Sequence, residues 1–363
     1  MKFFTNVFSV ILFVITLITL ILLVISAYSS YLDPEKYPII SNSGMGFPII
    51  LILHTLLFIF LLFFKRNYAI ISFIGFVAIW SQFKIYMPIN RYTTPPKDAI
   101  KFLSYNIMNF NGLKKDSLGE NSILNYLVNS KADIICLQEY AETNNKKLLT
   151  RGEIKEALKE YPYSSVSTVG DKGSNNQLAC FSKFPIKSAK KIAYSSAYNG
   201  SIAYIIHIEG EDFLIINNHF ESNKITKEDR IAYERLIKGK EKDKMLDDTK
   251  GLASKITDAS VIRKHQADSV AHLIDKSSFT HVIACGDFND SPLSYTNRVL
   301  EEYLTNAYVS SGKGLGISYN QNKFYFRIDN ILVSNNLKAY HCTVDKSIKT
   351  SDHYPIWCYI AKQ

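Results

Sequence analysis

The chain has 363 residues, of which 42 are basic and 33 acidic, and its formal net charge is +9. This length allows one large domain or two ordinary ones. Seven basic and three acidic residues lie among the first 100, so an excess of only five basic residues is spread over the rest. Composition therefore gives no support for the clustered basic face that duplex-binding proteins usually have.

Three apolar segments lie before residue 90. Residues 6–28 contain no charge and are long enough to cross a hydrocarbon core of about 30 Å. Residues 46–64 form a second such segment, and residues 68–87, with Lys84 near their end, form a weaker third one. A cleaved signal peptide is the alternative for the first segment, but such signals have an apolar core of only about 7 to 15 residues. We therefore predict a membrane anchor over residues 1–90 with about three transmembrane helices.

The short loops predict the orientation of this anchor. Lys2 precedes the first segment, and Lys65 and Arg66 separate the second from the third; basic residues in such loops stay on the cytoplasmic side. Three spans then give a multi-pass protein of the cell membrane whose remaining residues are extracytoplasmic. If residues 68–87 are instead a buried or interfacial helix, those residues face the cytoplasm. We expect His54, inside the second segment, to hydrogen-bond a neighbouring helix, because no segment contains an acidic partner.

Residues 91–99 contain adjacent prolines and polar residues and predict a linker. In residues 100–363, short apolar runs rich in β-branched and aromatic residues alternate with amphipathic stretches. Such runs predict about eight strands, at residues 100–108, 133–139, 177–186, 201–210, 212–220, 280–288, 326–334 and 353–360. Between the fifth and sixth of these strands, residues 224–275 are charged with apolar residues at helical spacing and predict two or more helices, the last packed on a sheet. The pattern is typical of a two-layer or sandwich α+β domain.

Polar side chains that can bind a metal or a phosphate stand at the ends of five predicted strands. They are Asn106, Glu139, His219, the pair Asp287 and Asn289, and the pair Asp352 and His353 at the start of the last strand. One such residue is typical of a solvated strand end, but this set predicts a common site at one rim. Carboxylates with oxygen and nitrogen partners and no thiolate favour Mg²⁺ or Mn²⁺. Because these ions neutralise phosphoryl oxygens, the predicted reaction is phosphoester hydrolysis.

Two of these motifs allow alternative interpretations. Asp287 and Asn289 are two residues apart, so their side chains point to one face of an extended strand, whereas the alternative is an Asx-rich turn. Asp329 lies inside an apolar strand, where a carboxylate without a partner is costly to bury. Its partner is either Arg327, in an ion pair, or a histidine, of which His353 is the obvious one.

Six short motifs occur in an order that resembles one known family. They are SYN at 104–106, LQE at 137–139, NNH at 217–219, GDFN at 286–289, RID at 327–329 and SDH at 351–353. With these motifs, the segment from about residue 100 to 361 resembles the endonuclease/exonuclease/phosphatase superfamily. This superfamily includes pancreatic-type deoxyribonucleases, inositol-polyphosphate phosphatases and bacterial sphingomyelinases. The resemblance implies a four-layered α/β sandwich, in which two packed mixed sheets are flanked by helices and the site lies at the rim between the sheets.

The resemblance also implies roles for the motif residues. Glu139 would be the principal metal ligand, assisted by Asn106 and Asp352. Asp287 would position or activate the attacking water and Asn289 would contact the phosphate. His353, oriented by Asp329, would be the catalytic histidine, with His219 as a second donor. Asn176 would lie at the edge of the site, as a substrate contact or as part of a polar turn.

The substrate stays open between several hypotheses. The helical insertion at residues 224–260 is unlike the short loop of DNA-cleaving members, and no arginine-rich or aromatic loop is present to grip a duplex. The first hypothesis is a membrane-anchored, Mg²⁺-dependent phosphoesterase for which a phospholipid head group is an attractive substrate. The second is a nuclease cleaving DNA or RNA, and the third is a non-catalytic receptor or scaffold. The third needs a broken motif, and no motif residue is missing.

Overall fold

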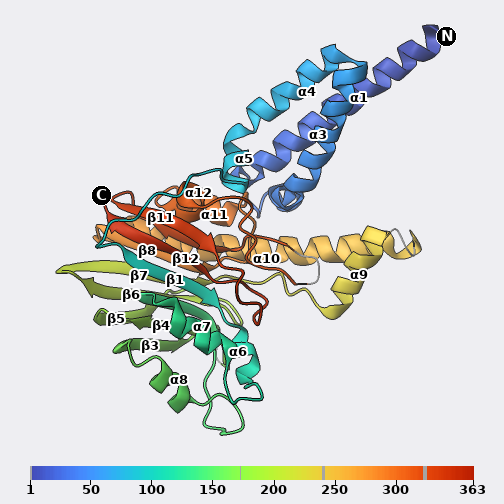
Figure 1. Ribbon diagram of the computed structural model, residues 1–363. Helices are drawn as coiled ribbons and strands as arrows, with labels where there is room; N and C mark the ends of the chain where they lie inside the picture. The colour runs from blue at the N-terminus through green and yellow to red at the C-terminus, as the bar shows by residue number, and fades with distance from the viewer. Residues whose placement is uncertain (1, 172, 239–241, 322–324) are drawn as a thin grey trace.

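The structure is a computed structural model that describes residues 2–171, 173–238, 242–321 and 325–363. A rod of helices formed by residues 2–86, here called the helical part, extends from one side of a larger body of strands and helices, here called the sandwich (Figure 1). The N-terminus lies at the far end of the helical part, and the C-terminus lies in the sandwich.

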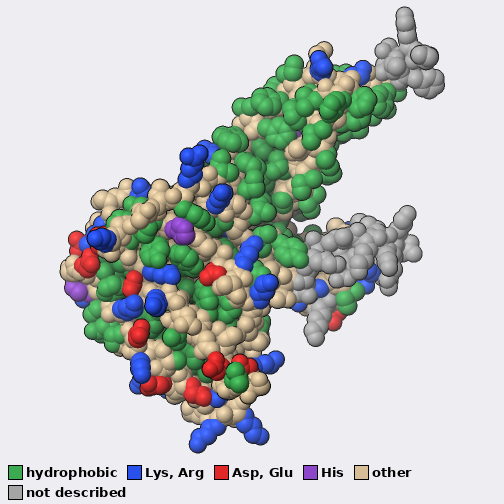
Figure 2. Space-filling view, in the orientation of Figure 1, with side chains coloured by type: hydrophobic (Ala, Val, Ile, Leu, Met, Phe, Trp, Pro, Cys, Tyr) green, Lys and Arg blue, Asp and Glu red, His purple; other side chains and the backbone are tan. Residues whose placement is uncertain are grey.

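The helical part has the composition of a membrane-embedded structure. Its helices are α1 (Lys2–Tyr28), α2 (Pro38–Ser41), α3 (Phe47–Phe64), α4 (Arg66–Ala78) and α5 (Trp80–Tyr86), with 3-10 turns η1 (Ser29–Tyr31) and η2 (Ser43–Gly46). Two segments, Val7–Tyr31 and Ser43–Phe64, are long and apolar enough to cross a membrane. Helices α4 and α5 are bent by 57° at the break between them and make a third such segment only if counted as one. Figure 2 shows hydrophobic side chains covering the outside of this rod.

His54 makes polar contacts with neighbouring apolar helices, as the sequence predicts. His54, on α3, approaches Thr19 Oγ1 on α1 at 3.1 Å through Nδ1, and its Nε2 lies 2.9 Å from Oγ of Ser72 on α4. His54 and Ser72 are fully buried between the helices, and Thr19 is half-buried. Both ring nitrogens of His54 are therefore satisfied by neighbouring helices, as expected for a polar group that water cannot reach.

The sandwich contains two six-stranded mixed sheets. The first has the order β11 (Leu337–Val344), β12 (Ile356–Lys362), β1 (Ile100–Asn106), β2 (Ile134–Tyr140), β4 (Gln177–Ser182) and β3 (Tyr163–Thr168). The second has the order β5 (Ile186–Lys191), β6 (Gly200–Ile208), β7 (Glu211–His219), β8 (His281–Asp287), β10 (Asp329–Val333) and β9 (Thr305–Asn306). The last strand begins at Ile356, so the prediction that Asp352 and His353 open it is wrong. These two residues lie in the segment before the strand.

Three apolar layers hold the sandwich together. Residues such as Phe102 and Ile215 form a fully buried core between the sheets. Helices α6 (Met108–Leu113), α7 (Ser122–Ser130) and α8 (Arg151–Ala157) belong to the layer outside the first sheet, and α10 (Lys242–Lys276) and α11 (Tyr295–Glu301) to the layer outside the second. The other helices are α9 (Lys227–Lys238), in the predicted insertion, and α12 (Ala307–Ser311). The predicted four-layered α/β sandwich is confirmed.

The sheet topology brings the polar strand ends together. Strands β1 and β2 are parallel, as are β7 and β8, so the carboxyl ends of each pair lie at one edge. His219 is the register partner of Asp287, and Asp329, at the start of antiparallel β10, is also paired with Asp287. Residues distant in the sequence therefore converge where the two sheets meet.

Candidate active site

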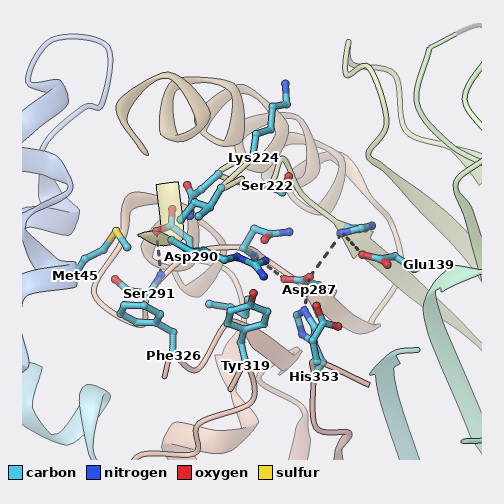
Figure 3. Close-up of a pocket in the computed structure, with 17 residues that line it drawn as sticks. Met45, Glu139, Ser222, Lys224, Asp287, Asp290, Ser291, Tyr319, Phe326 and His353 are labelled. Atoms are coloured by element: carbon cyan, nitrogen blue, oxygen red, sulfur yellow. Dashed lines mark hydrogen bonds and ion pairs between the residues drawn. The ribbon is translucent and has the colours of Figure 1, made fainter. Parts of the chain in front are cut away.

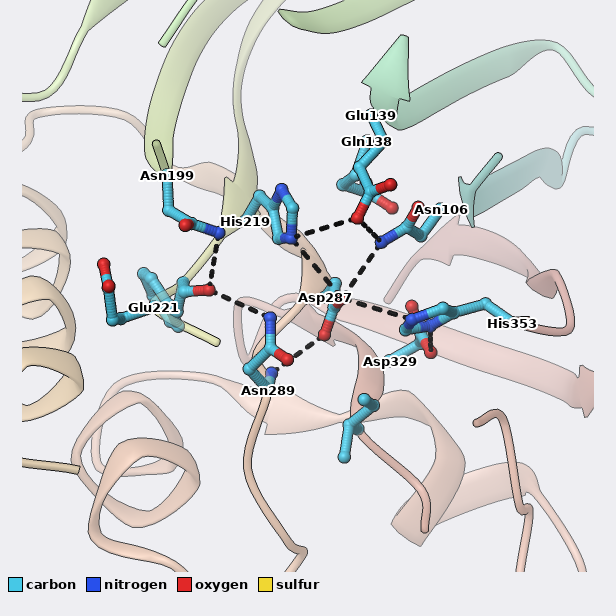
Figure 4. Close-up of polar contacts among 12 residues, drawn as sticks. Asn106, Gln138, Glu139, Asn199, His219, Glu221, Asp287, Asn289, Asp329 and His353 are labelled. Atoms are coloured by element: carbon cyan, nitrogen blue, oxygen red, sulfur yellow. Dashed lines mark hydrogen bonds and ion pairs between the residues drawn. The ribbon is translucent and has the colours of Figure 1, made fainter. Parts of the chain in front are cut away.

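Asp287 is the centre of the polar cluster. Its Oδ2 accepts a hydrogen bond from the side-chain amide of Asn106 at 3.1 Å, and its Oδ1 accepts one from the backbone N–H of Asn289 at 2.9 Å (Figure 4). Nε2 of His353 lies 3.5 Å and Nε2 of His219 lies 3.7 Å from the same Oδ2. Burial, together with the charge of Asp329, raises the pKa of Asp287 to about 6, against the lowering effect of His353.

Asp329 has His353 as its partner. Nδ1–H of His353 donates to Oδ2 of Asp329 at 2.8 Å, and both residues are buried. Burial alone would lower the pKa of His353, but the carboxylates of Asp329 and Asp287 raise it well above its usual value. The other proposed partner, Arg327, points away and donates to the backbone carbonyls of Ile85 and Leu315. The structure thus contains the predicted Asp329–His353 hydrogen bond and no ion pair between Asp329 and Arg327.

Glu139 and His219 face Asp287 from the other side. The amide of Asn106 donates to Oε1 of Glu139 at 3.1 Å, and Nε2 of His219 lies 3.8 Å from that oxygen. Glu139 has a left-handed φ of 50°, where the pairing of β2 with β4 changes register, and this bulge directs its side chain toward the cluster. Burial raises the pKa of Glu139 and lowers that of His219. A neutral His219 that accepts the amide N–H of Asn176 at Nδ1, 3.3 Å away, carries its own proton on Nε2.

Buried side-chain amides next to Glu139 and His219 form a second hydrogen-bonded set that supports the site. Gln138, beside Glu139, donates through Nε2 to Oδ1 of Asn217 at 2.6 Å and to Oγ of Ser104 at 3.2 Å. Asn217 in turn donates to the backbone carbonyl of Leu137 at 3.0 Å. These bonds cross from β1 and β2 to β7, so the two sheets are fixed to each other directly beneath the site. The supporting roles of Gln138 and Asn217 were not predicted from the sequence, although these residues lie inside the LQE and NNH motifs.

The GDFN motif is a turn that also supplies the central carboxylate. Strand β8 ends at Asp287, and Asn289 has a left-handed φ of 52°, so the two side chains do not share one face of a strand. The amide of Asn289 donates to the backbone carbonyl of Phe220 at 2.9 Å. Gly286 is required here because a Cβ at that position would lie 1.9 Å from the carbonyl oxygen of Asn218. The Asx-turn interpretation is therefore correct for the backbone.

The predicted residues do not all reach the cavity at the site. Glu139, His219, Asp287, Asn289, Asp352 and His353 line a cavity of about 230 Å³ (Figure 3). Asn176 does not line it: its amide contacts His219 and donates to the carbonyl of Tyr198 at 3.0 Å. The prediction of Asn176 as a direct substrate contact therefore has no support in this cavity, and its position suits orientation of His219.

The donor set fits a hard divalent cation. Carboxylates of Glu139 and Asp352 line the same cavity, and within the described ranges neither is ion-paired with a lysine or arginine. Asn106 does not line the cavity: its amide nitrogen faces Glu139 and Asp287, and its Oδ1 accepts a hydrogen bond from the backbone N–H of Met108 at 3.2 Å. Oxygen ligands without a fixed counter-cation suit Mg²⁺ or Mn²⁺. Asp287, Asp329 and His353 also have ligand atoms within 4.8 Å of one another, but the hydrogen bond between the last two already uses Nδ1 of His353.

Arg263, which was not predicted as a site residue from the sequence, organises two loops around the cavity. This arginine of α10 is fully buried, and its Nε donates to Asp290 at 3.1 Å. The same guanidinium donates to the carbonyl of Glu221 and to Oδ1 of Asn223, both at 2.9 Å. It thereby ties the loop after NNH to the loop after GDFN. In the sequence it stands in a charged helix, where nothing distinguishes it from solvated neighbours.

Comparisons with known proteins identify the family and the fold of the sandwich. The model of the Endonuclease/Exonuclease/phosphatase family matches residues 103–353, and that of a domain of unknown function matches residues 9–86. The chain has a TM-score of 0.51 and 14% identity to D. rerio TDP2 humanized by 14 mutations, covering 73% of this chain and 100% of that one. An endonuclease/exonuclease/phosphatase from Beutenbergia cavernae DSM 12333 has a TM-score of 0.50 and 13% identity, covering 73% of this chain and 72% of that one. Sphingomyelinase C from Streptomyces griseocarneus has a TM-score of 0.47 and 16% identity, covering 73% of this chain and 99% of that one.

No curated protein matched the chain. The likeness to solved structures shows a shared fold, and the family match covers all six motifs, from SYN to SDH. The chain belongs to the endonuclease/exonuclease/phosphatase family.

Proposed function

We propose that the protein is a divalent-metal-dependent phosphoesterase that hydrolyses a phosphodiester or phosphomonoester by in-line attack of water. The observation that carries this proposal is the buried Asp287 carboxylate, held by Asn106 and Asn289 and flanked by His219 and His353. This arrangement supplies a base, two imidazole donors and adjacent carboxylates around one cavity. Such groups stabilise the charge that develops on a phosphoryl group.

Each side chain has a distinct task in this proposal. Asp287 accepts a proton from the attacking water, and its raised pKa makes it a stronger base than an ordinary carboxylate. His353, kept protonated by Asp329, donates from Nε2 to a phosphoryl oxygen. His219 donates from Nε2 as the second imidazole. Asn289 lines the cavity and fixes Asp287 through its backbone N–H.

Glu139 and Asp352 would hold Mg²⁺ or Mn²⁺ at the open side of the cluster, and Asn106 would join them as a ligand only with its amide turned over, so that Oδ1 replaces the nitrogen that now faces Glu139. The bound ion would neutralise negative charge on the phosphoryl oxygens. The raised pKa of Glu139 supports this assignment, because a half-buried carboxylate without a fixed cation is favoured in its charged form when it binds one.

We further propose that residues 1–90 anchor the enzyme by three crossings, with residues 91–99 as a connection to a catalytic domain over 100–363. Contacts at the ends of α1 and α5 support three crossings. Ser29, after α1, contacts Leu293 of the sandwich, and Ile85, at the end of α5, contacts Arg327. Both helices therefore run toward the sandwich, and the domain would lie opposite to the N-terminus, which is the extracytoplasmic side if Lys65 and Arg66 stay in the cytoplasm.

Hydrolysis of bis-p-nitrophenyl phosphate by the full-length protein in detergent tests the proposed activity. We expect Mg²⁺ or Mn²⁺ to be required, a chelator to abolish the rate, and Glu139→Gln and His353→Asn each to lower kcat by about 100-fold or more. Glu142→Gln is the matched control, since that carboxylate lies three residues away and does not line the cavity. Wild-type rates in both site variants would exclude this mechanism.

A further inference from the structure

The cavity at the active site extends to the helical part. Glu139, Asp287 and His353 lie at one end, and Met45 and Phe326 lie at the other (Figure 3). Met45 belongs to η2, the short turn that leads directly into α3. A residue of the N-terminal helices therefore forms a wall of the catalytic cavity, about 240 residues away in the sequence from Asp287.

This wall lies where a membrane surface would be. The segment Ser43–Phe64 is long and apolar enough to cross a membrane, and the 18 residues of α3 span about 27 Å, close to the hydrocarbon thickness of about 30 Å. Little of α3 can therefore extend beyond the hydrocarbon. If this segment crosses the membrane, Met45 lies at the interface of the leaflet nearest the sandwich.

The segment just before Met45 presents apolar side chains to the outside. Tyr37, Ile39 and Ile40 are 51%, 75% and 43% exposed, respectively. Ile39 and Ile40 belong to the short helix α2, and Tyr37 directly precedes it, in the connection between α1 and α3. Exposed aliphatic and aromatic side chains next to a spanning helix are favourable when they enter the headgroup region of a bilayer.

Close contacts fix this connection to the loop that follows the GDFN motif. Gly44 packs so tightly on the carbonyl oxygen of Leu293 that a Cβ would lie 2.3 Å from it. The hydroxyl of Ser29 donates to the same carbonyl at 3.3 Å, and the amide of Asn42 donates to Oγ of Ser260 at 2.9 Å. The catalytic loop and the membrane-facing turn thus form one packed unit rather than two parts joined by a flexible tether.

The walls between the two ends suit a molecule that is both anionic and apolar. Ile225, Tyr319 and Ile328 provide apolar surface, while Lys224 and Arg230 add positive charge on the same side as the insertion. The ammonium of Lys224 is ion-paired with Glu221 at 2.7 Å, and the side chain of Lys224 is 54% exposed. A water-soluble nucleotide would gain little from an apolar wall that ends at Met45.

We propose, on the basis of the phosphoesterase function above, that the substrate is a membrane phospholipid drawn from the leaflet nearest the sandwich. Its phosphate reaches Asp287 and His353, and its acyl-bearing part stays along Met45 and the surface of α2. In the reaction, the oxygen of water bonds to phosphorus and one P–O ester bond breaks. The proton lost by water ends on the departing alcohol, so no further reactant is required.

The test uses full-length protein reconstituted in vesicles of phosphatidylcholine that contain phosphatidylglycerol or phosphatidic acid, with bis-p-nitrophenyl phosphate as the soluble comparison. We expect vesicle lipid to be hydrolysed, and Met45→Asp to lower lipid hydrolysis by about tenfold more than hydrolysis of the soluble ester. Met87→Asp is the matched control, because Met87 lies at the end of α5 and does not line the cavity; it should leave both rates unchanged.

The outcomes separate this inference from the function on which it rests. Hydrolysis of the soluble ester without hydrolysis of any vesicle lipid would overturn the lipid substrate and leave the phosphoesterase function standing, whereas no hydrolysis of either would overturn both. Equal loss on both substrates in Met45→Asp, or faster cleavage of a DNA oligonucleotide than of lipid, would also overturn the lipid assignment. Met45→Gln, checked by its Tm, repeats the comparison if the aspartate variant fails to fold.

Discussion

Asp329 accepts a hydrogen bond from Nδ1–H of His353 at 2.8 Å, in a position where both side chains are buried. Asp329→Asn keeps the shape of the side chain but removes the charge that holds the imidazole protonated. We expect kcat for bis-p-nitrophenyl phosphate to fall by about 100-fold with little change in KM. Asp345→Asn, at a carboxylate that accepts a bond from Tyr126 outside the cavity, should have the wild-type rate. A wild-type kcat in Asp329→Asn would refute the proposed role of this bond.

Glu301 gives the protein a pH-dependent stability away from the active site. Burial raises the pKa of its carboxyl to about 7, although the amide of Asn306 and the charge of Arg327 lower it. The folded state therefore binds this proton more tightly than the unfolded state, whose carboxyl titrates near pH 4.5. The stabilisation is complete below that pH and is lost as the pH rises to about 7, with a change of about 1–2 kcal/mol for a partly exposed group.

Thermal unfolding in detergent measures this effect. We expect the Tm of the wild type to fall between pH 4.5 and 7 relative to Glu301→Gln, whose amide does not titrate. Glu302→Gln is the matched control, because the neighbouring carboxylate is exposed and should leave the pH profile of the wild type unchanged. Parallel profiles for Glu301→Gln and the wild type would show that Glu301 does not cause the dependence.

At the residue level, the order of the motifs was enough to predict that these residues form one site. Their hydrogen-bond partners could be identified only from the structure. The choice between Arg327 and His353 as partner of Asp329 could not be made from the sequence. Arg327 instead donates to the backbone carbonyls of Ile85 and Tyr86, more than 200 residues away in the sequence. Every residue has a backbone carbonyl, so the residue types do not indicate which one is the partner. For the same reason the turn at Asn289 could not be distinguished from a strand.

At the level of elements, the predicted strands are the inner ones. Four strands were missed, and they are the outermost strands of the two sheets: β3, β5, β9 and β11. Inner strands are covered on both faces and give continuous apolar runs, as in β8, whose seven residues are all buried. An edge strand such as β5 is largely exposed, and polar edge residues hinder pairing with other chains. The sequence signal for such strands is therefore weak.

Arg327 joins the RID motif to the end of α5. Its guanidinium is buried, donates to the carbonyls of Ile85, Tyr86 and Leu315, and lies 4.7 Å from the ring centre of Tyr308. Carbonyls at a helix C-terminus have no partner within the helix, so a cation there satisfies them. Arg327→Met would leave these carbonyls buried without donors.

We expect Arg327→Met to lower the free energy of unfolding by about 2–4 kcal/mol. Arg298→Met is the control: Arg298 donates to the carbonyl of Ser30 at 2.9 Å but is partly exposed, and its loss should cost less than about 1 kcal/mol. Chemical unfolding of the full-length variants in detergent compares the two. Equal losses would mean that Arg327 does not have this special role in holding α5 to the sandwich.

At the level of the whole molecule, the helical part meets the sandwich through one end only. The end of α1, the turn before α3 and the end of α5 all contact the sandwich, through Ser29, Gly44 and Ile85. The connection between α3 and α4, at Lys65, lies at the other end of the rod, as the ribbon shows (Figure 1). Helices α1 and α4–α5 therefore run in one direction and α3 in the opposite one.

This arrangement predicts the positions of the two chain ends. If α4 and α5 together cross the membrane, the chain crosses three times and its termini lie on opposite faces; with two crossings, both termini lie on the same face. We expect protease added to sealed, right-side-out membrane vesicles to remove a C-terminal tag and to spare an N-terminal tag, because Lys65 and Arg66 favour the cytoplasmic side.

Detergent-opened vesicles serve as the control, since both tags should then be cleaved, and exchanging the tags excludes a difference in their sensitivity. Cleavage of both tags, or of neither, in sealed vesicles would mean that α4 and α5 do not form a span. The bend of 57° between them would then mark a segment that lies at the membrane surface, and the sandwich would share the side of the N-terminus. With two crossings, the connection between α1 and α3 would lie on the face opposite to the sandwich, so the contacts of Ser29, Gly44 and Met45 with the sandwich could not form. This result would therefore also contradict the proposed lipid substrate, which depends on Met45 as a wall of the cavity.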